Sequence, residues 1–524
     1  MARKLPPDVS DSDFRRALDG FAGVVGKEWV IADEEAGLNS YRDPFAIVDD
    51  DRFEPSAAVA PNSVEQVQDV VRIAGENSIP LWPVSTGKNL AYGGPAPRLP
   101  GSVVLDLKRI NRILEVNEEF GYALVEPGVS YFDLYQHLQE TGSKLWLDPA
   151  SNAMGGVVGN TVDRGVGYTP YGDHFAMQCG MEVVLDDGSL LRTGMGALPN
   201  NNTWQLFKYG FGPYLDGLFT QSNYGVVTKL GIWLMPEPPG FRPYLVTFPR
   251  EEDIEQVIDI LRPLKINLVI QNAATISNIL LDACMTTTRS QHYTGDGPLP
   301  PSVLKKIMAD EKIGMWNFYS ALYGPEPIMD ATWSVIQDAL SVVPGAKFYF
   351  ENDRKGDPVM EYRKKLMSGV PTMAEFNLIN WVGDGGGHVD FAPISPTTGA
   401  DAIKQYEMIK ARHEQYGYDY LGEFIIGWRE MHHIVTLVFD GEDEDRKTQA
   451  HDLFAVLIDE AAKAGYGEYR THIEYMDQIA GTYDWNDNAL LRMNERLKDA
   501  LDPKGILAPG KQGIWPKHLR GRKN

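Results

Sequence analysis

The stretch Ile79-Pro-Leu-Trp-Pro-Val-Ser-Thr-Gly-Lys-Asn89 changes from an apolar run to a polar, glycine-containing turn within a few residues. The run 79–84 is typical of a short strand, and 85–89 is typical of the turn that follows one. Upstream, Ser63 and Gln66 are spaced as a capping box, which marks the start of a helix. Five apolar side chains then recur at helical spacing: Val64, Val67, Val70, Val71 and Ala74. The sequence therefore predicts a helix, a strand and a turn in that order.

Further strands are expected in the first half of the chain, at 103–107, 122–126 and 182–185. Asp187-Gly188 predicts a hairpin turn between the apolar runs 183–185 and 190–191. Strand and helix signals mix without a regular repeat. The predicted fold class is therefore α+β rather than a doubly wound parallel sheet.

A turn-rich break, Pro236-Glu-Pro-Pro-Gly240, precedes a second block with longer helical patterns. Its predicted helices are 252–261, 401–416 and 443–464, and its predicted strands are 424–426 and 433–439. The tail around 502–510 is rich in turns and is expected to return to the first domain. The predicted division is one domain at 1–238, a second at 239–466, and a C-terminal return at 467–524.

The charge and hydropathy of the chain exclude several classes of protein. A formal net charge of −23 argues against nucleic-acid binding and against docking on anionic lipid, since both need a basic surface. No apolar run reaches 18 residues, so no membrane span is expected. The segment 1–7 has basic residues without an apolar run behind them, which argues against a secretory signal. Two distant cysteines, Cys179 and Cys284, suggest buried, reduced thiols and a cytoplasmic protein.

Glycine-rich segments are the first sign of a ligand site. They lie at 155–160, 163–168 and 383–388. Glycine lets the backbone approach a phosphate or a flat ring and present free N–H groups, although ordinary tight turns explain many such clusters. The Rossmann fingerprint and the phosphate loop of nucleotide hydrolases are both absent.

Metal and serine-nucleophile chemistry lack their usual patterns. The histidines form no HxH or HExxH pair, no CxxC occurs and GxSxG is missing, so no metal is predicted. His432 and His433 are neighbours that would point to opposite faces of a strand, so at most one can face a given site.

Longer motifs carry a resemblance to a known family. They are Pro83–Asn89, Tyr92-Gly-Gly, Val158–His174, Gln221–Thr228, Phe424–His433, Gly467–Arg470 and Ile506–Lys511. In this order and over nearly the whole chain, they resemble the vanillyl-alcohol oxidase branch of FAD enzymes, including its bacterial eugenol and 4-alkylphenol oxidases. The resemblance implies an FAD domain, built from the N-terminal half and the C-terminal tail, and a cap domain over the flavin ring.

The resemblance also implies which residues bind FAD. The loop 83–89 would lie against the pyrophosphate, with residues 154–168 and 223–228 completing the cradle. The cofactor-binding residues implied are Pro83, Val84, Ser85, Thr86, Gly87, Lys88, Asn89, Met154, Gly155, Gly156, Gly159, Asn160, Asp163, Gly167, Gly225, Val227, Arg470 and Lys511. His388 matches the histidine that bonds covalently to the flavin 8α-methyl group in the oxidases. Such a link would raise the flavin potential and favour hydride acceptance, with O2 as the final electron acceptor.

The implied reaction is hydride loss from the benzylic carbon of a 4-alkylphenol. A phenolate pushes electron density through its ring, so the site must hold the anion in a pocket with donors and positive charge. Tyr92, Tyr469 and Arg470 match the family's phenolate-binding residues; the alternative is two packed tyrosines and a surface arginine. The other active-site residues implied by the resemblance are Tyr168, Glu423, Ile425 and His432, with Glu423 and Ile425 on one face of a strand.

Two departures from the oxidases affect these expectations. Ser151 stands where many relatives carry an aspartate that assists water addition to the quinone methide, and serine cannot act as a carboxylate base. Asp390 and Ala392, beside His388, replace smaller or more polar residues. Asp390 could supply the missing carboxylate or could be a surface or capping residue.

Three other functions compete with the oxidase. The chain could be a cresol-type dehydrogenase that reduces a cytochrome; Ser151 and the stretch 391–395 favour this, whereas His388 favours the oxidase. It could also store flavin or sense a ligand without turnover, although the intact set Tyr92, Tyr469 and Arg470 argues against this. A carbohydrate oxidase would need a second covalent flavin link through cysteine, and Cys179 and Cys284 lie outside the flavin motifs. The expected partners are a small 4-alkylphenol, O2 and further copies of the chain, in a homodimer or larger homo-oligomer.

Overall fold

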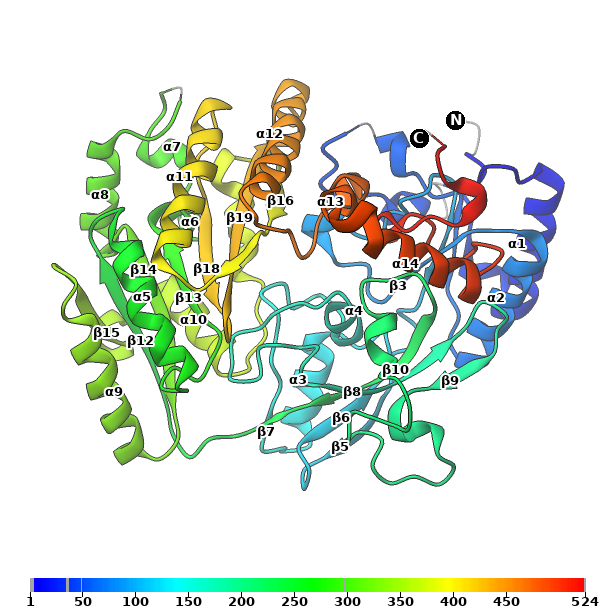
Figure 1. Cartoon of the computed structure of the whole chain (residues 1–524), viewed down its shortest axis with the longest axis horizontal. Helices are drawn as coiled ribbons and strands as arrows, with labels where there is room; N and C mark the ends of the chain where they lie inside the picture. Colours follow the sequence, from blue (N-terminus) through cyan, green and yellow to red (C-terminus); the bar gives the residue numbers. More distant parts are fainter. Residues whose placement is uncertain (1–3, 34–36, 49, 296, 523–524) are drawn as a thin grey trace.

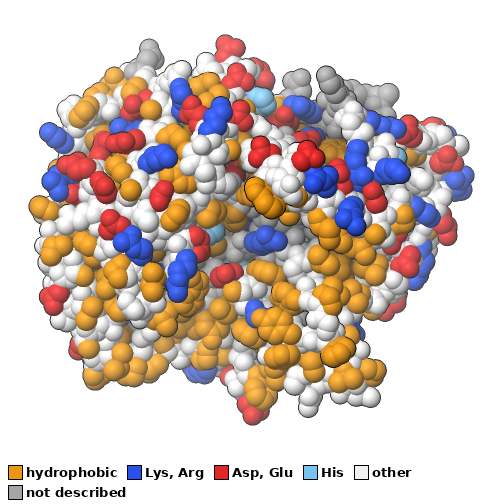
Figure 2. All heavy atoms as spheres, viewed as in Figure 1, with side chains coloured by type: hydrophobic (Ala, Val, Ile, Leu, Met, Phe, Trp, Pro, Cys, Tyr) orange, Lys and Arg blue, Asp and Glu red, His pale blue; other side chains and the backbone are white. Residues whose placement is uncertain are grey.

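The computed structural model describes residues 4–33, 37–48, 50–295 and 297–522. Two halves lie side by side (Figure 1). The segment 1–7, which carries the argument against a secretory signal, falls partly outside the described residues. Among those described, no helix combines the length and apolar character needed to cross a membrane. Acidic and basic side chains are interspersed over the face in Figure 2.

Over its described residues, the first half contains two larger sheets and a small two-stranded one. A four-stranded sheet has the order β1 (Val30–Ile31), β2 (Ala57–Val59), β4 (Val103–Asp106) and β3 (Leu81–Val84), and β2 and β3 run parallel to β4. An antiparallel sheet has the order β5 (Ile113–Asn117), β6 (Tyr122–Val125), β10 (Val226–Trp233), β8 (Gln178–Val184) and β9 (Leu190–Arg192). A small sheet pairs β7 (Leu145–Trp146) with β11 (Met235–Pro236). The helices of this half are α1 (Asp11–Val25), α2 (Val64–Asn77), α3 (Tyr131–Glu140) and α4 (Val157–Val162).

Two local predictions can be compared directly with this half. The hairpin at Asp187-Gly188 is confirmed: it joins β8 to β9, and Gly188 adopts a positive φ of 77°. Only one of the two hydrogen bonds of the predicted capping box forms at α2: the Ser63 side chain accepts from Gln66 N at 3.3 Å. The Gln66 side chain instead accepts from Asn62 N at 2.9 Å. The reciprocal bond therefore goes to the preceding residue rather than to the N-cap.

The second half is built on one antiparallel sheet. Its order is β15 (Lys347–Phe350), β12 (Phe241–Phe248), β14 (Trp316–Tyr323), β13 (Ala274–Asn278), β18 (Gly422–Ile426), β19 (Glu430–Asp440) and β16 (Gly386–Phe391), and β17 (Ile394–Pro396) also pairs with β19. The helices that precede β19 are α5 (Asp253–Ile266), α6 (Ile279–Cys284), α7 (Arg289–His292), α8 (Pro301–Glu311), α9 (Glu326–Leu340), α10 (Pro358–Met367) and α11 (Gly399–Gln415). The 3-10 segment η8 (Ala374–Val382) leads into β16. Helix α12 (Glu444–Lys463) follows β19.

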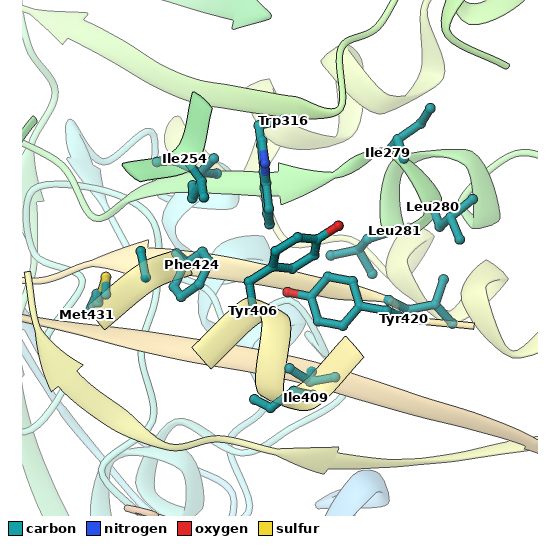
Figure 3. Close-up of a cluster of buried hydrophobic side chains, with 14 of the residues drawn as sticks. Ile254, Ile279, Leu280, Leu281, Trp316, Tyr406, Ile409, Tyr420, Phe424 and Met431 are labelled. Atoms are coloured by element: carbon teal, nitrogen blue, oxygen red, sulfur yellow. The ribbon is translucent and has the colours of Figure 1, made fainter. Parts of the chain in front are cut away.

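An aromatic core holds the helices against this sheet. Figure 3 shows Trp316 from β14 pointing toward Tyr406 of α11, and their rings meet edge to face at 5.0 Å. Tyr406 makes a second edge contact, with Tyr420, also at 5.0 Å. Each such pair adds about 0.5–1.5 kcal/mol to the stabilisation from apolar burial. This packing fixes the position of β18, which carries two of the predicted site residues.

The C-terminal tail crosses back to the first half. After α13 (Met476–Thr482) and α14 (Trp485–Leu501), Leu81 N donates to Ile506 O, and Ala508 N donates to Leu81 O, both at 2.7 Å. The buried Lys498 ammonium donates to Asp502 at 2.6 Å and to the carbonyl oxygens of Asn223 and Leu507. These bonds hold the tail against β3. The boundaries at 238 and 466 remain a prediction.

Candidate active site

A deep cavity lies between the two halves, and most of the predicted site residues line it. The lining residues predicted for the cofactor are Pro83, Val84, Ser85, Thr86, Gly87, Lys88, Asn89, Gly155, Gly156, Gly159, Asn160, Asp163, Gly225, Val227, His388 and Lys511. Those predicted for the substrate are Tyr92, Ser151, Tyr168, Asp390, Glu423, Ile425, Tyr469 and Arg470. The structure thus brings together residues that lie hundreds of positions apart in sequence.

Three predicted residues lie outside the cavity lining. The Met154 side chain is 41% exposed to solvent. Gly167 instead allows close packing, since a Cβ there would overlap the Asp148 carboxylate. The half-buried His432 ring lies edge-on to Tyr469 at 4.8 Å. Burial lowers the pKa of His432 to about 4, so its ring is neutral at pH 7. His432 can therefore act on a ligand only through Tyr469.

The turn after β3 presents unpaired backbone donors. Over the described residues, no backbone N–H from Ser85 to Asn89 donates to another protein group. Gly87 supplies a positive φ of 68°, which a residue with a side chain seldom adopts. Backbone N–H groups in such a turn form a concave site for anions. The turn is therefore suited to the negative oxygens of a pyrophosphate.

Helix α4 approaches this turn more closely than side chains would allow. A Cβ at Gly159 would stand 2.1 Å from Ser85 Oγ, and one at Gly156 would stand 2.8 Å from the same atom. Contacts that close do not occur, so both positions require glycine. The glycine-rich segment serves to bring α4 against the turn, which leaves the cavity between them narrow and lined by backbone.

Asp163 ties three segments of the cavity wall together. Its carboxylate accepts from Asn89 Nδ2 at 3.2 Å and lies 3.3 Å from Lys511 Nζ, so it joins the turn after β3 to the tail. Gln221 Nε2 donates to Asp163 O at 3.2 Å and to Tyr469 O at 2.7 Å. Asp163 and Gln221 therefore connect the end of the cavity suited to a pyrophosphate with the end that carries Arg470.

At that end, Arg470 lies between two tyrosines. Its Nη2 donates to Tyr92 OH at 3.2 Å, and its guanidinium stacks over the Tyr92 ring at 4.2 Å. Among the described residues, the Arg470 Nε and the Tyr469 OH have no hydrogen-bond partner. Within the described ranges, no carboxylate lies within ion-pair distance of Arg470. A cation in a pocket without a counter-ion favours an anionic ligand.

The two tyrosines are held in their donor form. Burial raises the pKa of Tyr92 and of Tyr469 above the ordinary tyrosine value, although Arg470 opposes the rise. Burial lowers the pKa of the Arg470 guanidinium, but its interactions with Tyr469 and Tyr92 outweigh burial and raise that pKa above the ordinary arginine value. At neutral pH the pocket therefore offers two O–H donors and one fixed positive charge.

His388 faces the cavity from β16 between two aromatic rings. The Phe45 and Phe376 rings lie 5.0 Å and 5.8 Å from the imidazole. The His388 side chain is buried and its Nδ1 has no hydrogen-bond partner. Burial lowers the pKa of His388, so the ring is neutral at pH 7 and its nitrogen lone pair is free.

The opposite end of the cavity is formed by the cap sheet and η8. Glu423 and Ile425 both line the cavity, as strand alternation predicts, while Phe424 between them stacks on the buried His433 at 4.1 Å. Glu423 accepts from Arg363 Nη2 at 2.7 Å. Asp390 lies between the two ends and accepts from Thr436 at 2.9 Å.

Glu375 and Arg363 were not predicted from the sequence. Glu375 lies on η8 and lines the cavity, and burial, followed by the charge of Glu423, raises its pKa to about 7. Neither residue belongs to a recognisable motif. The only sequence signal was Glu375, the one charged side chain in the segment 374–382, which precedes the glycine run at 383–388.

Family models match both halves of the chain. Residues 55–194 match the FAD binding domain, and residues 321–512 match the C-terminal domain of FAD linked oxidases. No group of three or more described His, Cys, Asp or Glu side chains is arranged to hold a metal ion. The fold and the cavity therefore define a two-domain, FAD-linked oxidoreductase, and the predicted α+β fold class is confirmed.

Individual relatives narrow this class. The flavoprotein subunit of 4-cresol dehydrogenase [hydroxylating] from Pseudomonas putida is 43% identical over 97% of each chain. The structure of a 4-ethylphenol oxidase from Gulosibacter chungangensis, in complex with isoeugenol, is 43% identical over 98% of this chain and 100% of that one, with a TM-score of 0.96. A p-cresol methylhydroxylase with bound substrate is 42% identical over 98% and 99%, with a TM-score of 0.95. The chain belongs to the vanillyl-alcohol oxidase and p-cresol methylhydroxylase family of FAD-dependent enzymes.

Proposed function

We propose that this protein is an FAD-dependent oxidase that removes hydride from the benzylic carbon of 4-alkylphenols. The observation that carries the proposal is Arg470, a cation without a carboxylate partner that faces the cavity beside Tyr92 and the unpartnered Tyr469 OH. The substrates named for two relatives, a 4-cresol dehydrogenase and a 4-ethylphenol oxidase, support the same substrate class.

The residues present fit FAD. The free N–H groups of 85–89 and the backbone at Gly156 and Gly159 would hold the pyrophosphate, and Lys511 would add positive charge. His388 would bond to the 8α-methyl group through a ring nitrogen that has no other partner. When bound, FAD supplies the two-electron acceptor for the hydride.

The protein's own contribution is to stabilise the phenolate. Arg470 would hold the oxyanion by charge, while the Tyr92 and Tyr469 hydroxyls donate to its lone pairs. Electron density pushed from the phenolate oxygen through the ring weakens the benzylic C–H bond, and hydride loss leaves a neutral quinone methide. Arg470, Tyr92 and Tyr469 are in place before the phenol binds and keep their own charge during the step. The site therefore stabilises the reacting anion without having to reorganise, which lowers the barrier.

The electron acceptor distinguishes the oxidase from a cytochrome-coupled dehydrogenase. His388 favours O2, because in the resembled family a histidyl flavin link occurs in the oxidases. The test is to incubate the purified protein with 4-propylphenol in air and to measure H2O2 and substrate loss. Equal amounts of both are expected. Substrate loss that requires added cytochrome c, without H2O2, would instead favour the dehydrogenase.

The fate of the quinone methide depends on the groups near its benzylic carbon. It can lose a proton to give an alkene or add water to give an alcohol. Ser151 offers no carboxylate, Glu423 is paired with Arg363, and Asp390 accepts from Thr436. Glu375, with a pKa of about 7 and no cationic partner among the described residues, is the carboxyl best suited to exchange a proton with water.

Position 151 is expected to set the preference for alkyl over alcohol side chains. Wild type should show a higher kcat/KM for 4-propyl-2-methoxyphenol than for vanillyl alcohol, because serine leaves room and adds no charge beside the benzylic carbon. Ser151→Asp should shift this ratio toward vanillyl alcohol by about tenfold or more, because the added carboxylate can make one hydrogen bond with the benzylic hydroxyl, and a hydrogen bond to a charged group contributes a free energy of that size. Ser151→Ala is the matched control for size. An unchanged ratio in Ser151→Asp would show that this position does not determine specificity.

A further inference from the structure

The cavity has two ends of opposite electrostatic character. Arg470 and the two donor tyrosines form one end. Glu375, Glu423 and Tyr168 line the other, where the para substituent of a phenol bound at Arg470 would lie. Tyr168 interacts with the charges of Glu375 and Glu423, whereas Tyr92 interacts with Arg470, so the two ends are separate environments.

The only cation at the second end, among the described residues, is already paired. Arg363 is 3% exposed, and its Nη2 donates to Glu423 Oε2 and to Ser277 Oγ, both at 2.7 Å. Asp282, also buried, lies 4.0 Å from the same nitrogen. One guanidinium therefore faces two carboxyl groups before Glu375 is counted. Its Nε and Nη1 have no hydrogen-bond partner among the described residues, but Arg363 does not line the cavity and so does not present them to a ligand there.

Glu375 faces the cavity without a cation of its own. It lines the cavity from η8 and interacts with the Ser151 hydroxyl, and no Lys or Arg among the described residues lies within 4.0 Å of its carboxyl. Phe376, Leu281 and Ile425 line the same region with apolar surface. A carboxyl group within largely apolar walls lacks the water that would screen its charge.

Its ionisation falls in the neutral range. Burial, then the charge of Glu423, raises the pKa of Glu375 to about 7, and burial raises the pKa of Asp282, which lies 4.0 Å from Arg363, to about 7. The titratable and charged groups that face Glu375 from the surrounding elements are Glu423 on β18, Arg363 and Tyr362 on α10, Asp390 on β16, Cys284 on α6, and Tyr168. Glu375 is therefore neutral below about pH 7 and anionic above it.

We propose that Glu375 makes this cavity selective for phenols whose para substituent is uncharged, so that side chains ending in a carboxylate are excluded although they fit by size. The proposal rests on the proposed function, because it assumes that the phenol oxygen lies at Arg470. It assigns the substrate class more narrowly than 4-alkylphenols in general: alkyl, hydroxyalkyl and amide side chains are accepted, and carboxyalkyl side chains are rejected.

The expected discrimination is large. Two negative charges about 5 Å apart at an effective dielectric constant of about 20 repel each other by an amount equal to about a hundredfold in affinity. A carboxylate on the substrate stays ionised from about pH 6 upward, as a glutamate side chain does in water. The repulsion therefore follows the ionisation of Glu375 and increases as pH rises through about 7.

The experiment compares two ligands that differ only in charge, 3-(4-hydroxyphenyl)propanamide and 3-(4-hydroxyphenyl)propanoate. The holoenzyme is mixed with each under anaerobic conditions, and the rate constant of flavin reduction is divided by the dissociation constant. This measurement does not depend on the final electron acceptor. At pH 8 the amide is expected to exceed the acid by about a hundredfold. For wild type the ratio should fall as pH decreases from 8 to 6.

Glu375→Gln tests the residue itself. It keeps the size and hydrogen-bonding capacity of the side chain but removes its charge, so the amide-to-acid ratio should fall by about tenfold or more and lose its pH dependence. Glu361→Gln is the matched control, since it removes an exposed acid from α10, outside the cavity lining. The ratio in that variant should equal that of wild type.

The outcomes separate this proposal from the proposed function. If 4-propylphenol does not reduce the flavin, the proposed function is wrong. If 4-propylphenol reduces the flavin and wild type uses the acid and the amide equally at pH 8, the proposed function stands and the charge selectivity is wrong. A wild-type preference for the amide that persists unchanged in Glu375→Gln would also overturn the role of Glu375. The wild-type pH series tests the proposal even where the variant does not fold.

Discussion

Replacing Arg470 with alanine is expected to lower kcat/KM for 4-alkylphenols. The expected loss of transition-state stabilisation is about 2–4 kcal/mol, the range for loss of one preorganised oxyanion partner. This corresponds to a decrease between about 30-fold and about 900-fold. The reason is that Arg470 is the only positive charge placed beside Tyr92 and Tyr469 in the described part of the cavity. Without it, burial would favour the neutral phenol over the phenolate.

Replacing Arg470 with lysine distinguishes the effect of the positive charge from the effect of the planar guanidinium group. Arg470→Lys keeps a cation but loses the planar fork that can face the oxyanion while Nη2 donates to Tyr92. It should therefore lose less activity than Arg470→Ala but should not equal wild type. The measurements are steady-state kinetics and the absorbance change when a 4-substituted phenol binds as its anion, which should disappear in Arg470→Ala.

Tyr469→Phe completes the comparison at this end of the cavity. The Tyr469 hydroxyl has no hydrogen-bond partner among the described residues, so its removal breaks none of their hydrogen bonds and its effect reports the ligand. FAD content must be equal in all variants for the rates to be compared. If Arg470→Ala retained activity on 4-alkylphenols within a few-fold of wild type, the phenolate end of the cavity would have been assigned wrongly.

The sequence predicted local features of the site better than the contacts between distant segments. The turn 85–89 and the alternation of Glu423 and Ile425 follow from rules that act over a few residues, and the structure shows both. The Arg363–Glu423 pair does not follow from such rules. It forms because α10 packs against β14 and brings a buried arginine to β18, which only the tertiary fold determines.

The helices also show that features determined by the tertiary fold were not predicted from the sequence. Helix α5 continues to Ile266, beyond the predicted end at 261, because Pro263 removes only one backbone donor while Leu264 remains buried against the core. Helices α9 and α10 were not predicted, although each begins at a proline-containing N-terminus that is compatible with a helix. Their apolar faces become recognisable only when the sheet they cover is known.

The two ends of the cavity explain why motifs located the phenolate end but not the opposite end. Tyr469 and Arg470 are adjacent in sequence, and Tyr92 follows the turn after β3, so short motifs contain them. Glu375 acquires its raised pKa from burial and from Glu423, which is far away in sequence. A property that arises from burial and from a distant charge has no local sequence signal.

The environment of His388 supports our proposal that the flavin is bound covalently there. The imidazole is buried and neutral, its Nδ1 has no partner, and Phe45 and Phe376 restrict how the ring can turn. A neutral imidazole has the nitrogen lone pair that bond formation requires, whereas an imidazolium does not. Burial therefore keeps the residue in its reactive form at neutral pH.

Denatured wild-type protein is accordingly expected to keep its flavin. After acid precipitation the pellet should remain yellow, whereas His388→Ala should release all of its FAD into the supernatant, because the cradle at 85–89 holds the cofactor only while the protein is folded. His518→Ala, which removes an exposed histidine, is the control and should behave as wild type. Absorbance of pellet and supernatant, with the mass of the intact chain, measures both species. A colourless wild-type pellet, or a yellow His388→Ala pellet, would show that the link is absent or lies at another residue.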